Sequence, residues 1–73
     1  MSYPVVNPVE TGENINRIRK EKGITVKDTS EYFGMVNTNS IYKWLRGETL
    51  PSLENFYALS VLLETSMNDI IAV

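Results

Sequence analysis

Hydrophobic residues recur at three- and four-residue spacing along most of the chain, and no segment alternates convincingly with a period of two. This pattern predicts helices at about 11–22, 26–33 and 38–46, a fourth after Ser52, and a last turn at 66–71. The first ten residues carry Pro4 and Pro8 and show no helical period. We therefore expect an extended arm at 1–10, followed by an all-α, five-helix domain at 11–73.

The predicted helix ends carry residues that suit them. Short polar residues that can accept hydrogen bonds from free N–H groups stand at the expected N-caps, Thr11, Thr25, Asn37, Ser52 and Ser66. Asp28 and Asp69 follow Thr25 and Ser66 at the spacing of a capping box. Glycines, which accept a left-handed backbone, stand at the expected C-termini, Gly23, Gly34 and Gly47.

The third predicted helix has an apolar and a polar side. Its apolar stripe joins those of the other helices in the expected core, Ile15, Ile18, Ile41, Trp44, Leu45, Leu53, Phe56, Leu59 and Leu63. The opposite side carries Thr38, Asn39, Tyr42, Lys43 and Arg46. Amides, cations, hydroxyls and phenols are the side chains that reach base edges and phosphates in a major groove of DNA. This side is the candidate functional surface.

Composition excludes several classes of function. The chain has 73 residues, enough for one domain, and no cysteine or histidine, so disulfides, the usual zinc ligands and the commonest general base are absent. Its nine carboxylates form no pair that the sequence places in an apolar pocket. We therefore expect no enzyme, metal, cofactor or small-molecule ligand. With no signal-peptide pattern and no apolar run of membrane length, a cytoplasmic, nucleoid-associated protein without membrane contact is expected.

Charge is unevenly distributed along the chain. The net charge is −2, which by itself disfavours nucleic acid, yet all seven basic residues lie between positions 17 and 46. That window holds three acidic residues and has a balance of +4, whereas the rest of the chain holds six acidic residues and no basic one. Such a distribution fits a one-sided contact with DNA, and it also fits the ordinary solvated face of a small helical domain.

Aromatic residues near these cations allow two interpretations. Trp44 beside Lys43 can be read as a base-stacking platform for single strands. Its spacing from Ile41 favours a place in the core instead. Tyr42, on the polar side, is the better candidate for touching nucleic acid, and Tyr32 suits surface packing equally well.

Four segments follow one another in a distinctive order: Arg19-Lys20-Glu21-Lys22-Gly23-Ile24-Thr25, Tyr32-Phe33-Gly34, Ile41-Tyr42-Lys43-Trp44-Leu45-Arg46-Gly47 and Leu50-Pro51-Ser52-Leu53. Together they resemble the phage repressor and Cro-type helix-turn-helix family. The resemblance covers residues 12–72 and is closest to small bacterial members with an Ile-Tyr-Lys-Trp third helix. It implies a five-helix, lambda-repressor-like domain whose second and third helices form the helix-turn-helix, with the third in the major groove.

The resemblance also implies roles for single residues. Asn39 occupies a position where relatives often carry a glutamine, and both amides can grip adenine. Base reading is thereby assigned to Thr38, Asn39, Ser40, Tyr42 and Lys43, although polar residues at a helix start are an alternative explanation for Asn39 and Ser40. Phosphate contact is assigned to Lys27, Arg46, Asn37 and Arg19.

Three departures from the family pattern bear on these roles. Val26 replaces a glutamine that contacts phosphate in relatives, and Lys27 is its natural substitute. Leu45 replaces a glutamate that pairs with an arginine equivalent to Arg19. We expect Arg19 to pair with Glu31 or Glu48, or to stay solvated and free for DNA, because a buried unpaired guanidinium is costly. The link from Gly34 to Ile41 has one residue more than the commonest form.

A second surface is predicted on the fourth helix. Tyr57, Ala58 and Val61 stand beside or outside its main apolar stripe, where many relatives carry lysine. With Ile71 and Val73 they make a candidate homodimer contact, the contact residues being Tyr57, Val61 and Ile71. A monomer with a slightly apolar surface explains the same residues.

The leading functional hypothesis is a sequence-specific regulator that binds double-stranded DNA, most plausibly a repressor. The alternative is a protein-interaction or antitoxin-like module on the same fold, favoured by the low isoelectric point and the missing family glutamines. An enzymatic role is remote.

Overall fold

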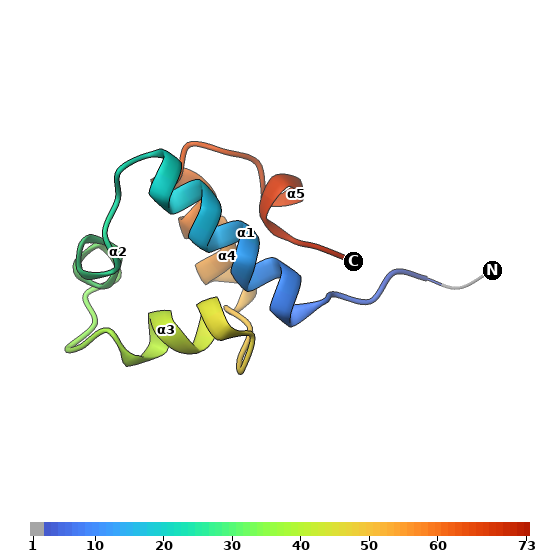
Figure 1. Cartoon of the computed structure of the whole chain (residues 1–73), viewed down its shortest axis with the longest axis horizontal. Helices are drawn as coiled ribbons and strands as arrows, with labels where there is room; N and C mark the ends of the chain where they lie inside the picture. Colours follow the sequence, from blue (N-terminus) through green and yellow to red (C-terminus); the bar gives the residue numbers. More distant parts are fainter. Residues whose placement is uncertain (1–2) are drawn as a thin grey trace.

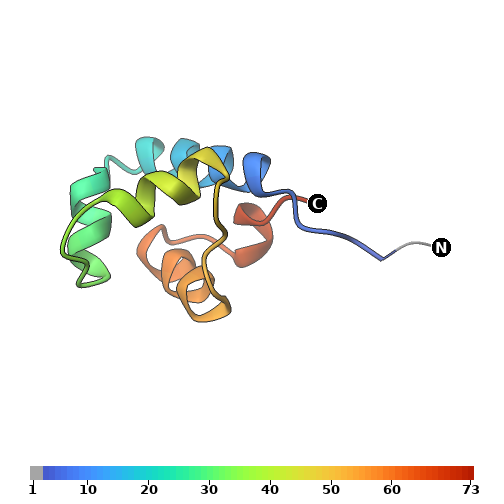
Figure 2. The same cartoon turned by 90° about the horizontal axis from the view of Figure 1, so that it is seen from below.

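A computed structural model of the chain describes residues 3–73 and consists there of five α-helices and their links (Figure 1). The helices are α1 (Pro8–Glu21), α2 (Val26–Tyr32), α3 (Asn39–Arg46), α4 (Leu53–Leu62) and α5 (Met67–Ile70). The predicted all-α class and the number and order of helices are confirmed. Figure 2 shows α1 and α3 side by side along one side of the domain, α4 with α5 along the other, and α2 at the end that is far from the chain termini.

The first helix begins earlier than predicted. Asn7, not Thr11, is the N-cap, because its side-chain oxygen accepts from Glu10 N–H at 3.0 Å and Pro8 occupies the first helical turn. Proline suits that position because its missing N–H has no partner there in any helix. The predicted arm at 1–10 is thus too long: of its described residues, only 3–7 are non-helical. The part of the arm before Tyr3 lies outside the described residues.

Thr11 has a different role from the predicted one. It is fully buried, and its hydroxyl oxygen accepts from Ala72 N–H at 3.0 Å. Asn7 N–H donates to Ala72 O at 2.7 Å, and Asn14 Nδ2 donates to Ile70 O at 3.1 Å. These bonds hold the C-terminal tail along the start of α1.

The core combines residues from all five helices. Its buried members are Ile15, Ile18, Val26, Ile41, Trp44, Phe56, Leu59, Leu63 and Ile70. Leu53 was expected among them but is 77% exposed. It is the first residue of α4, and Pro51, two residues earlier, is buried. Leu45 is partly buried and packs against the core as predicted.

The α1 and α3 helices approach each other unusually closely. A Cβ atom on Gly12 would lie 2.4 Å from Trp44 O, and a Cβ atom on Gly47 would lie 2.7 Å from Val9 Cα. Real side chains do not fit at such distances, so both glycines are required by packing. The contact fixes α3 firmly on the rest of the domain.

Within residues 3–73, no helix is long and apolar enough to cross a membrane. The same residues contain no group of three or more His, Cys, Asp or Glu side chains arranged to hold a metal ion.

Candidate nucleic-acid interface

The α3 helix presents its polar side away from the domain. It runs along the lower edge of the molecule in Figure 1, with no other element below it, and lies toward the viewer in Figure 2. Successive residues of an α-helix are rotated by about 100°, so five side chains follow one another around this side in the order Tyr42, Arg46, Asn39, Lys43 and Ser40. All five are exposed. Thr38, just before the helix, is partly buried.

The start of α3 differs in detail from the prediction. Thr38 holds the N-cap position but its side chain makes no capping bond. Asn37 Oδ1 instead accepts from Asn39 N–H at 2.9 Å, two residues on, as in an Asx-turn. The prediction of Asn37 as the N-cap is therefore wrong by one residue, although its side chain still satisfies an N–H group of the first turn.

The inner side of α3 is packing surface. Ile41 is completely buried and Trp44 is 6% exposed. The indole ring stands edge-on to Phe33 at 5.5 Å, and Phe33 stands edge-on to Tyr32 at 5.2 Å. Aromatic pairs favour this geometry, which here joins the end of α2 to the middle of α3. Because its faces are covered, Trp44 is excluded as a stacking platform for bases.

The α2 helix brings one cation to the same end of the domain. Thr25 and Asp28 form the predicted capping box: Asp28 N–H donates to Thr25 Oγ1 at 2.9 Å and Thr25 N–H donates to Asp28 Oδ2 at 3.1 Å. The second of these bonds is the main reason that the pKa of Asp28 lies below its usual range. In the first turn, Val26 is buried and Lys27 is exposed. Lys27 is thus the exposed cation of this turn.

The turn between α2 and α3 is well defined despite its additional residue. Gly34 has φ +68°, its N–H donates to Glu31 O at 3.0 Å, and Met35 N–H donates to Ser30 O at 2.9 Å. This pair of bonds is the Schellman motif that ends many helices. Met35 packs against the core and Val36 is completely exposed, so the longer link is accommodated as a solvent loop.

Arg19 is not available in the way predicted. Its Nη1 donates to Ile24 O at 2.9 Å, and Nη2 donates to Asn16 Oδ1. Its Nε is buried and has no partner within the described chain. The predicted pairing with Glu31 or Glu48 is wrong, since neither is an ion-pair partner of Arg19 within residues 3–73, and the guanidinium is hydrogen-bonded and partly buried instead of fully solvated. Nothing in the sequence signals this arrangement, because the main acceptor is a backbone carbonyl of the α1–α2 loop.

A second Schellman motif ends α3 and places an acidic residue beside its last cation. Gly47 has φ +77°, its N–H donates to Trp44 O at 3.1 Å, and Glu48 N–H donates to Lys43 O at 2.9 Å. The Glu48 carboxylate accepts from Arg46 Nε in an ion pair between two side chains that are each more than half exposed. Lys43 forms no ion pair among residues 3–73, so it is the uncompensated cation of α3.

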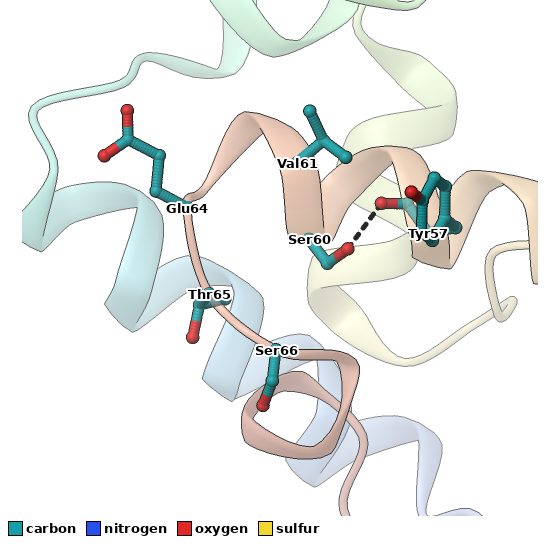
Figure 3. A pocket seen from close by; sticks show the side chains of 6 residues that line it. All are labelled: Tyr57, Ser60, Val61, Glu64, Thr65 and Ser66. Carbon is teal, nitrogen blue, oxygen red and sulfur yellow. Dashed lines mark hydrogen bonds between the residues drawn. The ribbon is translucent and has the colours of Figure 1, made fainter.

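The exposed side of α4 is apolar. Leu53, Tyr57 and Val61, spaced four residues apart, are 77%, 64% and 54% exposed and form a continuous stripe, named here the α4 stripe. An open groove continues it toward α5, lined by Tyr57, Ser60, Val61, Glu64, Thr65 and Ser66 (Figure 3). Ile71, predicted with Tyr57 and Val61 as a contact residue, is partly buried and packs against the core.

Comparisons with known proteins agree with this geometry. A sequence model described as helix-turn-helix matches residues 15–70. The chain is similar in structure to the restriction-modification controller protein C.AhdI from Aeromonas hydrophila, with 21% identity, a TM-score of 0.75, and 85% of this chain and 92% of that chain covered. It is similar to the DNA-binding domain of BldD, with 12% identity, a TM-score of 0.76 and coverages of 90% and 94%.

A third similar structure is the clp gene regulator ClgR from C. glutamicum, with 20% identity, a TM-score of 0.77 and coverages of 93% and 86%. No curated protein matches the sequence. At these identities the three structures establish the fold, and the family match covers most of the chain. The resemblance seen in the sequence is confirmed, as is the assignment to DNA-binding proteins and not to enzymes. The chain belongs to the helix-turn-helix family of DNA-binding transcription regulators.

Proposed function

We propose that the protein is a sequence-specific regulator, of the repressor type, that reads double-stranded DNA by placing α3 in the major groove. The observation that carries the proposal is the exposed polar side of α3, on which an amide, two cations, a hydroxyl and a phenol lie together. The rigid seat of α3 on α1, set by Gly12 and Gly47, supports it because base reading needs a helix held in one orientation.

Base reading is proposed for residues near the start of α3. Asn39 lies between Arg46 and Lys43 on the exposed side and suits a bidentate contact with adenine. Ser40 and Tyr42 flank it, and Thr38 adds a hydroxyl at the helix start. Lys43, one turn further on, suits a guanine edge or a phosphate.

Phosphate contact is proposed for Lys27, Arg46 and Asn37. Arg19 is omitted because its guanidinium is engaged at the end of α1. The basic window between positions 17 and 46 includes both helices of the motif, and the acidic remainder of the chain disfavours docking by other faces. DNA binding of this kind implies an association with the nucleoid.

The test is selection of bound sequences from a random duplex pool, followed by binding of two variants to the selected site. Asn39→Ala should relax the preference at one base pair, at a cost of roughly 1–3 kcal/mol for the preferred site. Lys43→Ala should weaken binding and, if the contact is with phosphate, lower the salt slope by about 1. Recovery of no enriched motif, or full binding by both variants, would overturn the proposed reading helix.

We also propose that two copies associate through the α4 stripe. An isologous contact pairs the same patch on both protomers, and a straight row of apolar side chains on one helix is self-complementary in that way. The three contact residues are Leu53, Tyr57 and Val61. Leu53 replaces Ile71 among them, because Ile71 packs against the core. A dimer of this form predicts a near-palindromic operator with half-sites about 10 base pairs apart.

The dimer is tested by sedimentation of the wild type and of Val61→Glu at micromolar concentration. Burying an unpaired carboxylate within the contact should shift the variant to monomer, since such a charge costs several kcal/mol. Ser40→Glu, which adds the same charge on the exposed side of α3, is the control and should leave association unchanged. A wild type that is monomeric both free and on DNA contradicts the proposal.

The alternative is a protein-interaction module on the same fold, and the apolar α4 stripe is the observation that favours it. A partner protein can cover that stripe as well as a second copy can. Retardation of random duplex at low salt, with preference for one sequence at physiological salt, supports the DNA-binding function. Failure to bind any duplex supports the module.

A further inference from the structure

We propose that Glu48 limits the affinity of the protein for the DNA backbone by partly neutralising Arg46. The inference rests on the proposed function, because it presupposes that the exposed side of α3 meets DNA. It concerns a residue just beyond the reading helix, at the turn after Gly47.

The position of Glu48 is fixed by the backbone. Its N–H donates to Lys43 O at 2.9 Å in the Schellman motif that ends α3. The preceding Gly47 is held at φ +77° and lies against Val9, so that no side chain fits there. The carboxylate is therefore carried on a turn that is locked between α3 and α1.

From this turn the carboxylate reaches Arg46, one of the two cations in the last turn of α3. Its Oε2 accepts from Arg46 Nε, and the two side chains remain 51% and 57% exposed. The guanidinium has five N–H donors in a planar fork, so engagement of Nε leaves the two Nη groups facing solvent. Arg46 can still donate to a phosphate, but with a negative charge in contact with it.

Neutralisation changes the electrostatics of binding in a measurable way. Affinity for duplex depends on the number of phosphates that are neutralised, since each releases counterions. A cation already paired with a carboxylate neutralises a phosphate less completely, so that fewer counterions are released from the DNA. The pair thus lowers the affinity for every sequence alike, because backbone contacts carry no sequence information. In a chain whose seven cations all lie in one window, this keeps non-specific binding weak.

The variant Glu48→Gln keeps the size and the backbone motif and removes the charge. We expect it to bind random duplex and the selected site more tightly by the same factor, about three- to tenfold near 0.1 M salt. The plot of log affinity against log salt should become steeper by up to about 1. The matched control is Glu21→Gln, which makes the same charge change and breaks the Arg17–Glu21 pair of α1, where Nη1 and Oε1 are 3.5 Å apart. It should change affinity less than twofold.

The role of Arg46 is isolated by repeating the substitution in an Arg46→Ala background. There Glu48→Gln should have less than half of its effect, measured as the logarithm of the affinity ratio. Equal effects in both backgrounds would mean that Glu48 repels DNA by its own charge and would overturn the proposal. So would weaker binding by Glu48→Gln, which would mean that Glu48 holds Arg46 in position for DNA, or tighter binding to the selected site alone.

Failure of the inference is distinguishable from failure of the proposed function. If the wild type binds no duplex at any salt concentration, the DNA-reading proposal itself is wrong, and the inference falls with it. If the wild type binds and Glu48→Gln is indistinguishable from it, only the inference is wrong. Circular dichroism should show the same helix content for all variants, because both side chains are at the surface.

Discussion

The α3 and α4 helices each bury an apolar stripe, but their exposed sides differ in polarity. On α3 the buried pair is Ile41 and Trp44, and the exposed side is polar and basic; on α4 the buried pair is Phe56 and Leu59, and the exposed side is the apolar α4 stripe. Their ends differ too, since α3 ends on a glycine and α4 on Glu64, both with positive φ. The difference supports the proposal that α3 meets nucleic acid and α4 meets protein, and four predictions test it.

The largest expected effect comes from truncating the large buried side chain of α3. Trp44→Ala removes a 6% exposed indole from the contact between α1, α2 and α3 and should destabilise the domain by about 3–5 kcal/mol. A small domain has little more than this in total, so the variant should be largely unfolded at 37 °C. Urea or thermal denaturation followed by circular dichroism measures it.

The matched variant on α4 is Leu53→Ala, which truncates a side chain that is 77% exposed. Its expected cost is within about 0.5 kcal/mol when the protein is monomeric. If Leu53→Ala were as damaging as Trp44→Ala at low protein concentration, the assignment of these residues to surface and core would be wrong. A cost that appears only at high concentration would instead support the dimer.

The next effect concerns the glycine that ends α3. Gly47→Ala must adopt φ +77°, which costs about 1–2 kcal/mol, and its Cβ would also meet Val9 Cα at 2.7 Å. The summed destabilisation should be about 2–3 kcal/mol, and DNA affinity should fall as α3 shifts. Gly23→Ala is the control: it has φ +71° but nothing within 4 Å of the added atom, so only the backbone strain applies. Equal costs for both variants would show that α1 does not press on the end of α3.

These glycines also show what the sequence can and cannot predict. Gly23, Gly34 and Gly47 were predicted as helix ends, and all three have a positive φ, because the left-handed region is where glycine is favoured. The fourth end was not predicted, since Glu64 has the same conformation with a side chain that gives no signal. Tertiary contacts such as the fit of Gly12 against Trp44 O were equally invisible, because they join residues far apart in the chain.

The candidate site also has features that the sequence predicts and features that it does not. The polar side of α3 was predictable from periodicity alone, since Ile41 and Trp44 fix which residues turn outward. Arg19 and Leu53 were misplaced for a physical reason: the first donates to a backbone carbonyl, and the second is the first residue of α4, where the helix has not yet reached the core. Periodicity reports which residues share a side, but not where along the core a helix begins.

A smaller effect is expected at the end of α4. Glu64 closes a Schellman motif, in which its N–H donates to Val61 O at 3.3 Å and Thr65 N–H donates to Ser60 O at 3.0 Å, with φ +52°. Glu64→Gly relieves strain of about 1 kcal/mol and costs up to a similar amount in chain entropy. The variant should be equally stable or more stable, by less than about 1 kcal/mol, in thermal denaturation. A loss above that would indicate that the Glu64 side chain stabilises the α4–α5 link.

The smallest effect is a pH dependence of stability. It has two sources, one aspartate beside α3 and one beside α4. Asp28 caps α2 beside α3, and Asp69 caps α5 beside α4. Hydrogen bonds from Thr25 lower the pKa of Asp28, and those from Thr65 and Ser66 lower the pKa of Asp69, both below the usual value of 3.8. A carboxylate with a depressed pKa in the folded state binds protons more readily when unfolded. Its contribution to stability is therefore complete above about pH 4 and is lost as the pH falls through the folded-state pKa.

Asp28→Asn and Asp69→Asn should each lower the free energy of unfolding at pH 7 and approach the wild type as the pH falls below about 4, in urea titrations at several pH values. Because the two aspartates belong to separate helices, the double variant should lose the sum of the two single losses. A deficit that stays constant between pH 7 and pH 2 would contradict the ionic origin. A deficit confined to Asp28→Asn would place the acid sensitivity in the helix-turn-helix, where loss of the α2 cap also disturbs the seat of α3 and should weaken DNA binding in parallel.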